Sequence, residues 1–176
     1  MDDVSIQVAV PDDAADLVSV HYETWLATYP SPENGITKQD IEAKLNQRTK
    51  EESVKWITSQ IKNNGIDSLR LVARLNGKIV GYCLVEKQAE FNKLKAIYIL
   101  PEAQGRSIGA KLIERGFAWL GNEKDIALEV VKYNTNAINF YKGLGFEIAG
   151  DAHNTAADLP SGAVMPEYRM IKKLSR

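Results

Sequence analysis

Residues 94–113 constrain the fold of this chain more than any other segment. The segment begins as an apolar strand pattern, passes through a turn that contains Gly105 and Gly109, and continues as an amphipathic helix. The first backbone amides of a helix have no partner within the helix, and the helix dipole adds positive potential where they point. The segment therefore predicts a strand, a turn and a helix that together can bind a phosphate or a diphosphate.

The residues of this turn narrow the kind of anion site. Arg106 can add a charged contact to a phosphate, and glycine lets the backbone approach a ligand closely. No Gly-Lys-Ser/Thr follows the turn, so it is not the loop that binds nucleoside triphosphates, and it lacks the spacing of a dinucleotide-binding loop. Taken alone, the spacing fits a tight strand-to-helix turn as well as it fits an anion site.

The rest of the chain alternates between strand and helix patterns. Asn76-Gly77 separates two strand-like runs, 68–74 and 78–86, and predicts a tight hairpin. Further strands are expected at 4–10, 93–100, 126–131, 146–149 and 167–171, and helices at 11–28, 37–47, 49–63, 107–120 and 135–144. The polar segment 151–166 carries neither pattern, and we interpret it as a mobile lid. This order predicts an α/β (α+β) fold with one mixed sheet and helices on its faces.

Composition narrows the functional class. The chain has 176 residues, of which 44% are hydrophobic, so a single domain over 1–176 can form a core without metals or disulfides. A formal net charge of −1 gives no support to a nucleic-acid or anionic-membrane partner. Cys83, the only cysteine, lies in an apolar run and is interpreted as buried and unreactive. We expect a cytoplasmic protein with no membrane span and no metal.

The turn resembles the coenzyme A-binding motif of the GNAT superfamily of N-acetyltransferases, whose core is Gln/Arg-x-x-Gly-x-Gly/Ala. Gln104 and Gly109 match that motif, and Ser107 stands where the family usually has glycine. A side chain there costs about 1 kcal/mol if the backbone is strained, while its hydroxyl can cap the helix or bind the phosphate. We expect cofactor binding to survive this departure and to be weaker.

Residues 128–146 resemble the second GNAT signature, Asn-x-x-Ala-x-x-Phe-Tyr-x-x-x-Gly-Phe. Its matching residues are Asn134, Ala137, Phe140, Tyr141, Gly145 and Phe146. The two motifs cover roughly residues 70–150 in the family's order and spacing. The resemblance implies a GNAT-like acyl-CoA N-acyltransferase fold, with a mostly antiparallel central sheet, helices on both faces, and acetyl-coenzyme A (acetyl-CoA) as the cofactor.

The resemblance also implies roles for individual residues. The strand at 95–99 is expected to splay from the strand at 126–131, so that pantetheine amides bond to free backbone groups in the gap, where one amide polarises the thioester carbonyl. In the family, the tyrosine at position 141 protonates the departing thiolate. The alternative interpretation of Tyr141 is a tyrosine packed in the core, and that of Asn134 is a residue in a surface turn. The expected cofactor-binding residues are Ile97, Tyr98, Ile99, Gln104, Gly105, Arg106, Ser107, Ile108, Gly109, Asn134 and Tyr141.

The expected reaction is direct attack of a primary amine on the acetyl thioester, because the sequence shows no Ser-His-Asp arrangement and Cys83 looks buried. An alkyl amine has a pKa of about 10.4, so some group must take its proton at pH 7. Family members often carry a glutamate on the strand before the turn, where Lys93 is aligned here. Glu90 is the candidate catalytic base, and Glu23, His21 and water are alternatives.

The acceptor pocket is expected between the first helices and the terminal strand pair. Glu23, Trp25 and Tyr29 are the candidate substrate-binding residues, although both aromatic side chains also fit a core role. An acidic set of Glu23, Glu33 and Asp40 favours a polyamine, while other small amines and protein or peptide amines stay open. The alternative functions are a coenzyme A-binding sensor or interaction module without catalysis, and an unrelated phosphate-binding protein. Dimers are the commonest soluble oligomers, so a homodimer is among the expected assemblies.

Overall fold

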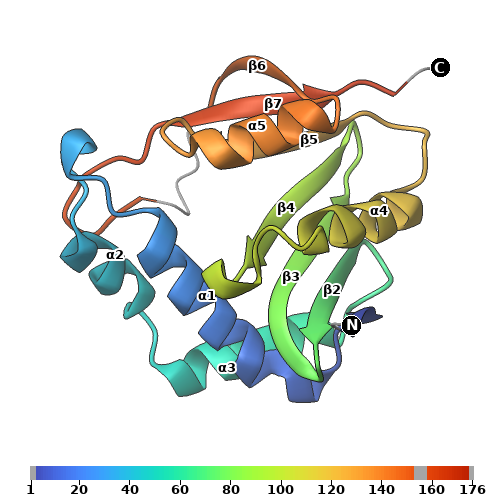
Figure 1. Ribbon diagram of the computed structural model, residues 1–176, viewed down its shortest axis with the longest axis horizontal. Coiled ribbons are helices and arrows are strands. Elements are labelled where there is room, and N and C mark those ends of the chain that lie inside the picture. Colours follow the sequence, from blue (N-terminus) through green and yellow to red (C-terminus); the bar gives the residue numbers. More distant parts are fainter. Residues whose placement is uncertain (1–2, 153–157, 175–176) are drawn as a thin grey trace.

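The computed structural model describes residues 3–152 and 158–174, and an open sheet runs through its centre (Figure 1). Within the described residues, seven strands follow the order β1-β2-β3-β4-β5-β7-β6. Neighbouring strands are antiparallel except β4 and β5, which are parallel. The predicted mixed, mostly antiparallel sheet is therefore confirmed. The strands are β1 (Val4–Val8), β2 (Ser68–Leu75), β3 (Lys78–Lys87), β4 (Asn92–Ile99), β5 (Ile126–Val131), β6 (Glu147–Ala152) and β7 (Glu167–Lys172).

Helices cover both faces of this sheet, as predicted. Successive side chains of a strand point to opposite faces, and on β2 Leu71 packs in the core under α4 while Val72 packs in the core under α1 and α3. No helix in the described ranges has the length and apolarity that a bilayer span requires. The helices are α1 (Ala14–Thr28), α2 (Lys38–Leu45), α3 (Lys50–Ile61), α4 (Ile108–Leu120) and α5 (Thr135–Gly143), with 3₁₀ turns η1 (Pro11–Asp13), η2 (Pro32–Asn34) and η3 (Pro101–Ala103).

Local sequence signals fix several of these boundaries. Thr49 accepts a hydrogen bond from the amide of Glu52 at 3.2 Å, and the Glu52 carboxylate accepts one from the amide of Thr49 at 2.8 Å. This capping box begins α3 where the sequence predicted it. Asn76 and Gly77 have φ angles of 51° and 84°, both in the left-handed region. That is the geometry of a two-residue hairpin turn, and it joins β2 to β3 as expected.

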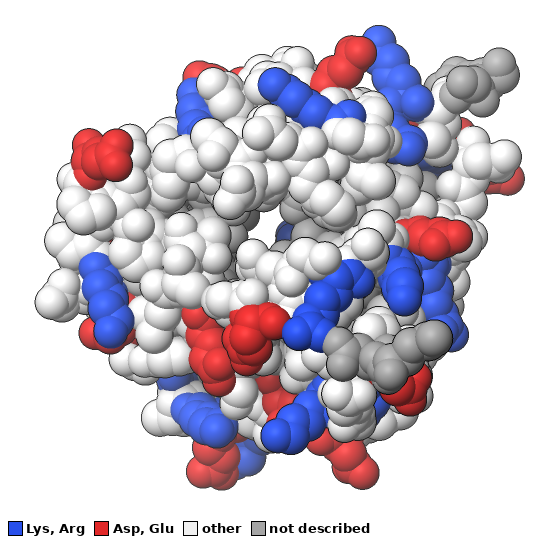
Figure 2. Space-filling view, viewed as in Figure 1, with Lys and Arg blue, Asp and Glu red and all other residues white. Residues whose placement is uncertain are grey.

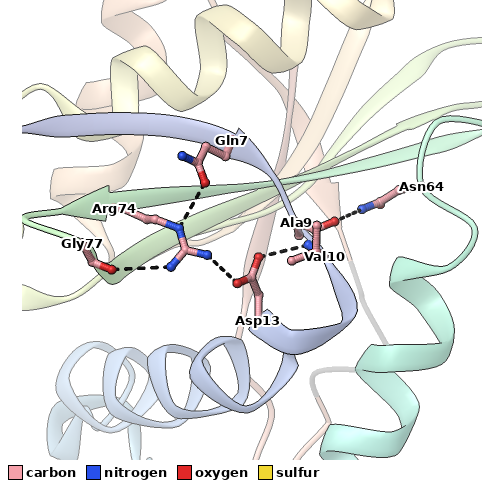
Figure 3. Close-up of polar contacts among 7 residues, drawn as sticks. All are labelled: Gln7, Ala9, Val10, Asp13, Asn64, Arg74 and Gly77. Atoms are coloured by element: carbon pink, nitrogen blue, oxygen red, sulfur yellow. Dashed lines mark hydrogen bonds and ion pairs between the residues drawn. The ribbon is translucent and has the colours of Figure 1, made fainter.

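A polar network ties the start of α1 to the sheet (Figure 3). Asp13 forms an ion pair with Arg74 of β2 at 2.5 Å, and its second carboxylate oxygen accepts from the amide of Val10 at 3.0 Å. Arg74 also donates to the side chain of Gln7 on β1 at 3.2 Å. Asp13, the N-cap residue of α1, makes no side-chain capping bond to the helix and bonds instead to the turn before it and to β2.

The one parallel strand pair is short. β4 and β5 pair only at Asn92 with Ile126 and at Lys93 with Ala127. Beyond Lys93 the two strands diverge, and Figure 1 shows β4 leaving β5 toward the N-terminal end of α4. The predicted splay of residues 95–99 from β5 is therefore confirmed.

The largest boundary difference concerns the end of the chain. β6 extends to Ala152, beyond the predicted strand at 146–149, because its pairing with β7 continues through a register shift at Gly150. Of the predicted lid at 151–166, residues 153–157 lie outside the described residues. Met165, which precedes β7, is buried.

Candidate active site

A cleft of about 880 Å³ lies where β4 and β5 separate. Figure 2 shows a hollow near the middle of this face, and the atoms around its mouth belong mostly to uncharged residues. The walls of the cleft come from α1, β4, the turn before α4, β5 and α5, and from Met165 and Glu167 near the end of the chain. A cleft of this volume accommodates an extended small-molecule ligand.

The wall formed by β4 presents backbone groups to this cleft. Leu100 donates to the carbonyl of Val80 at 2.8 Å, and the register between β3 and β4 is regular from there to Leu84. Because hydrogen-bonded positions alternate along an antiparallel strand, Ile97 and Ile99 direct their N–H and C=O groups away from β3, toward the separated β5. In the described residues, no strand pairs with this edge of β4 beyond Lys93.

Gln104 is the first residue of the turn and holds the end of β4. Its side-chain amide donates to the carbonyl of Ile99 at 3.1 Å. The first residue of the turn is therefore attached to the strand that carries the free backbone edge. The amide of Ile99 and both backbone groups of Ile97 still face the cleft.

The turn itself, residues 104–109, adopts two left-handed backbone positions. Gly105 has φ 76° and Ser107 has φ 59°. Ser107 precedes α4 as its N-cap residue, but its side chain makes no capping hydrogen bond, so the expected capping role is not found. The first residues of α4, Ile108 and Gly109, line the cleft, so the positive end of the helix dipole faces it.

Four residues of the second motif line the cleft, namely Asn134, which is the N-cap of α5, and Ala137, Phe140 and Tyr141 on α5. Asn134 accepts a hydrogen bond from the amide of Ala137 at 3.2 Å, so its oxygen caps α5. Tyr141 is buried, and burial raises the pKa of its phenol well above the ordinary value, with contributions from Tyr98 and Cys83. Tyr141 is therefore a protonated phenol at pH 7.

Aromatic side chains form the wall of the cleft on the α1 side. Trp25 and Tyr29 lie edge to face with ring centroids 4.9 Å apart, and the hydroxyl of Tyr133 donates to the carbonyl of Tyr29 at 2.9 Å. Tyr98 of β4 projects to the same side and lines the cleft with them. Trp25 and Tyr29 therefore belong both to a packed cluster and to the cleft, which joins the two interpretations open at the sequence level.

Residues 23–146, which include the turn and most of the cleft walls, match the model of the Acetyltransferase (GNAT) family. The chain belongs to the GNAT acetyltransferase family. The resemblance carried by the two sequence motifs is therefore confirmed.

Individual relatives agree with this assignment. The chain is 40% identical over 83 residues to the 5-NmdU N-acetyltransferase of Pseudomonas phage PaMx11, a match that covers 46% of this chain and 59% of the phage protein. It is 28% identical over 147 residues to an uncharacterised N-acetyltransferase of Archaeoglobus fulgidus, covering 78% and 89%. The PaiA N-acetyltransferase of Thermoplasma acidophilum, solved with coenzyme A, superposes with a TM-score of 0.74 at 23% identity, covering 97% and 99%. That likeness shows a shared fold.

The cleft brings together most of the residues expected to bind the cofactor of a GNAT enzyme. Three predicted site residues do not line it, namely Arg106, Glu90 and Glu23. Arg106 is the one expected cofactor residue outside the cleft lining. Glu90 is exposed in the bend before β4, which carries the chain about 3.3 Å per residue, so it lies a strand length from Ile99. Glu23 is exposed and lines a separate hollow on another side of α1. The structure does not support Glu90 as the base or Glu23 as a substrate contact.

Lys93, which takes the place of the family's usual glutamate, is held at the point where the strands separate. Its ammonium lies 2.6 Å from a carboxylate oxygen of Glu129 on β5. His21, the other alternative base, lies behind the aromatic wall with Nδ1 3.1 Å from the hydroxyl of Tyr82. Burial lowers the pKa of His21 to about 4, so it is neutral at pH 7 and a weak base.

Sequence reasoning missed Glu167 and Tyr133, which both line the cleft. Glu167 is buried at the start of β7, although a glutamate at the end of a strand pattern usually faces solvent. Its position is set by pairing with Val131 of β5, a contact between residues far apart in sequence. The one available signal was the alternation of the terminal strand, which places Glu167 and Met170 on opposite faces.

Replacing Ser107 with glycine should stabilise the fold. A side chain in the left-handed region costs about 1 kcal/mol, and the hydroxyl returns no capping bond here. Ser107→Gly should therefore raise the free energy of unfolding by about 0.5–1 kcal/mol in urea titrations. Asn76→Gly is the matched control because asparagine tolerates this region, so its gain should be smaller. If Asn76→Gly raises the free energy of unfolding as much as Ser107→Gly does, or more, the backbone strain assigned to Ser107 would be contradicted.

The neutral His21 should make the fold sensitive to acid. Its pKa is about 4 in the folded state and about 6.5 when exposed, so below pH 6.5 the unfolded chain binds a proton that the folded protein does not. Stability is then lost as the pH falls from about 6.5 to about 4. His21→Phe keeps an aromatic ring and removes this titration. Its melting temperature should fall less steeply than that of the wild type over this interval, and parallel curves would disprove the assignment.

Proposed function

We propose that this chain transfers the acetyl group of acetyl-CoA to a primary amine by direct attack of that amine. The observation that carries the proposal is the convergence of three features on one cleft in a GNAT family member. These features are the unpaired edge of β4, the N-terminal end of α4 and the buried phenol of Tyr141. The cleft and the family together leave three acceptor classes open, namely a small amine, a polyamine and a protein amine.

The residues of the cleft fit coenzyme A in two places. The first amides of α4 are suited to the diphosphate, because the first amides of a helix point out of its positive end. The backbone groups of Ile97 and Ile99 are suited to the amides of the pantetheine arm, which would add to β4 as a short strand. Bound acetyl-CoA supplies the thioester for the reaction.

Two groups of this chain would assist the reaction, namely the phenol of Tyr141 and a backbone amide of β4. Tyr141 is protonated at pH 7, and a phenol can donate to a thiolate, whose ordinary pKa is about 8.5. A backbone amide of the β4 edge, at Ile97 or Ile99, can donate to the carbonyl oxygen as negative charge develops on it. Cys83 offers no competing nucleophile, because it is fully buried, donates to the carbonyl of Leu112 at 3.6 Å, and has a pKa raised by burial to about 12.

Cofactor binding is tested at Gly109. A Cβ added there would lie 3.4 Å from the ring of Phe140 and 3.7 Å from Ile97, so a longer side chain enters the cleft. Gly109→Glu should raise the dissociation constant of acetyl-CoA about 100-fold in calorimetric titrations, through crowding and repulsion of the diphosphate. Gly143→Glu, at an open position on α5, is the control and should bind normally. Wild-type affinity in Gly109→Glu would refute the diphosphate placement.

Catalysis is tested at Tyr141. Tyr141→Phe removes the donated proton and should lower kcat about 100-fold in an assay of thiol release with an amine panel, with the dissociation constant of acetyl-CoA nearly unchanged. Tyr22→Phe, outside the cleft in the hollow beside Glu23, should keep wild-type turnover. Unchanged kcat in Tyr141→Phe would remove Tyr141 as the acid. Binding of acetyl-CoA without thiol release for any amine would instead favour a sensor.

A further inference from the structure

We propose that Glu167 binds the ammonium group of the acceptor and takes its proton, and that the acceptor is a monoamine with a flat apolar body. This inference rests on the proposed function and names the acceptor class for the same cleft. It replaces Glu90 and the acidic set of Glu23, Glu33 and Asp40, none of which lines the cleft.

Glu167 lies at the open end of the gap between β4 and β5, away from Asn92 and Lys93 where the two strands still pair. It is the first residue of β7, is 6% exposed, and lines the cleft. Its pairing partner is Val131, the last residue of β5, which is the strand that separates from β4. The carboxylate therefore projects from the side of the gap opposite the free backbone edge of Ile97 and Ile99, where the thioester is proposed to lie.

The position of Glu167 among the aromatic side chains is also defined. Glu167 lines the cleft together with Tyr29 and Tyr98. Burial raises the pKa of both phenols, and the negative charge of Glu167 adds to that rise. Val131 and Met165 belong to the apolar cluster that includes Trp25. An ammonium group beside this carboxylate would meet aromatic ring faces, which also attract cations.

The charges of the cleft limit the acceptor to one cation. Among the described residues, two carboxylates line it, those of Glu129 and Glu167, and Glu129 is paired with Lys93 at 2.6 Å. Lys95, at the exposed edge of β4, adds a positive charge to the lining. A polyamine would carry further ammonium groups into surroundings that offer them no carboxylate, and buried unpaired charges are costly.

The aromatic side chains of the cleft favour an acceptor with a flat body. Trp25, Tyr29, Tyr98 and Tyr133 supply ring surface from α1, β4 and the segment after β5. Aromatic rings stack on one another with favourable geometry beyond simple area burial. An arylalkyl monoamine therefore fits both halves of the acceptor site, with its ring against this wall and its ammonium at Glu167.

The proton balance of the step is complete. Glu167 takes one proton from the ammonium, and the neutral amine forms a C–N bond to the acetyl carbonyl as the C–S bond breaks. Tyr141 gives its proton to the sulfur that leaves. The new amide nitrogen loses a second proton, which restores Tyr141 through water, and Glu167 returns its proton to solvent. The sum is one amide, one thiol and one released proton.

The experiment measures kcat/KM at pH 7 for 2-phenylethylamine, spermidine and 2,2,2-trifluoroethylamine, whose fluorines keep most of the amine neutral. Wild-type protein should prefer 2-phenylethylamine over spermidine at least about tenfold. Glu167→Gln should lower kcat/KM for 2-phenylethylamine about 100-fold and should affect trifluoroethylamine far less, since that amine arrives without the extra proton. A merely structural defect would lower both alike. Glu147→Gln, on exposed β6 of the same strand pair, is the matched control.

The outcomes separate this inference from the proposed function. An unchanged affinity for acetyl-CoA in Glu167→Gln shows that the fold is intact, and Glu167→Asp, which keeps the carboxylate, should recover part of the activity. Wild-type turnover of 2-phenylethylamine in Glu167→Gln, or equal losses for both monoamines, would overturn the role of Glu167 alone. A preference for spermidine would overturn the acceptor class. Acetyl-CoA binding without turnover of any amine by the wild type would overturn the proposed function and this inference with it.

Discussion

The structure depends on how the sheet is interrupted between β4 and β5. Parallel pairing holds for two residue pairs, at Asn92 and Lys93, and then ends. A buried backbone N–H or C=O without a partner costs free energy comparable to a lost hydrogen bond, so proteins seldom leave a row of them inside. Here the row belongs to β4 and opens into a cleft, where solvent or a ligand can meet it. The remaining features of the site are arranged around this edge.

Packing keeps the two strands apart. The rest of β4 is bound on its other side by β3, and α4 packs over β3 with Ile108, Leu112 and Ile113 fully buried. β5 is bound on its far side by β7, and the ion pair between Lys93 and Glu129 closes the end where the strands still touch. Each strand thus has a firm partner away from the gap, so the gap does not require the two strands to be flexible.

The fold was predictable because its signals are local. The capping box at Thr49, the Asn76-Gly77 turn and the apolar stripe of α4 each act within a few residues, and the structure places the elements where these signals predict them. The turn and α5 were predicted to share one site because both motifs resemble GNAT signatures. The other residues that line the cleft were not predictable in this way, because they come from distant parts of the chain.

Glu90 and Glu167 show why nearness in sequence misleads. Glu90 is few residues from the strand of the site, but an extended chain carries it to the far end. Glu167 is remote in sequence and reaches the cleft through the register of β7 on β5. Ser107 was correctly identified as an unusual residue, and only the backbone angles show that its hydroxyl leaves α4 uncapped.

The wall of the cleft at β4 consists of main-chain atoms, and this has a consequence for how the protein tolerates change. Peptide groups are the same whatever side chain they carry, so exchange of Ile97 or Ile99 for residues of similar shape leaves the hydrogen-bonding edge intact. The aromatic wall and Glu167 consist of side chains, so each substitution there alters the surface that we propose the acceptor meets. Substitutions in the aromatic wall can therefore change which amine is accepted, while the backbone edge proposed to bind the acyl donor stays the same.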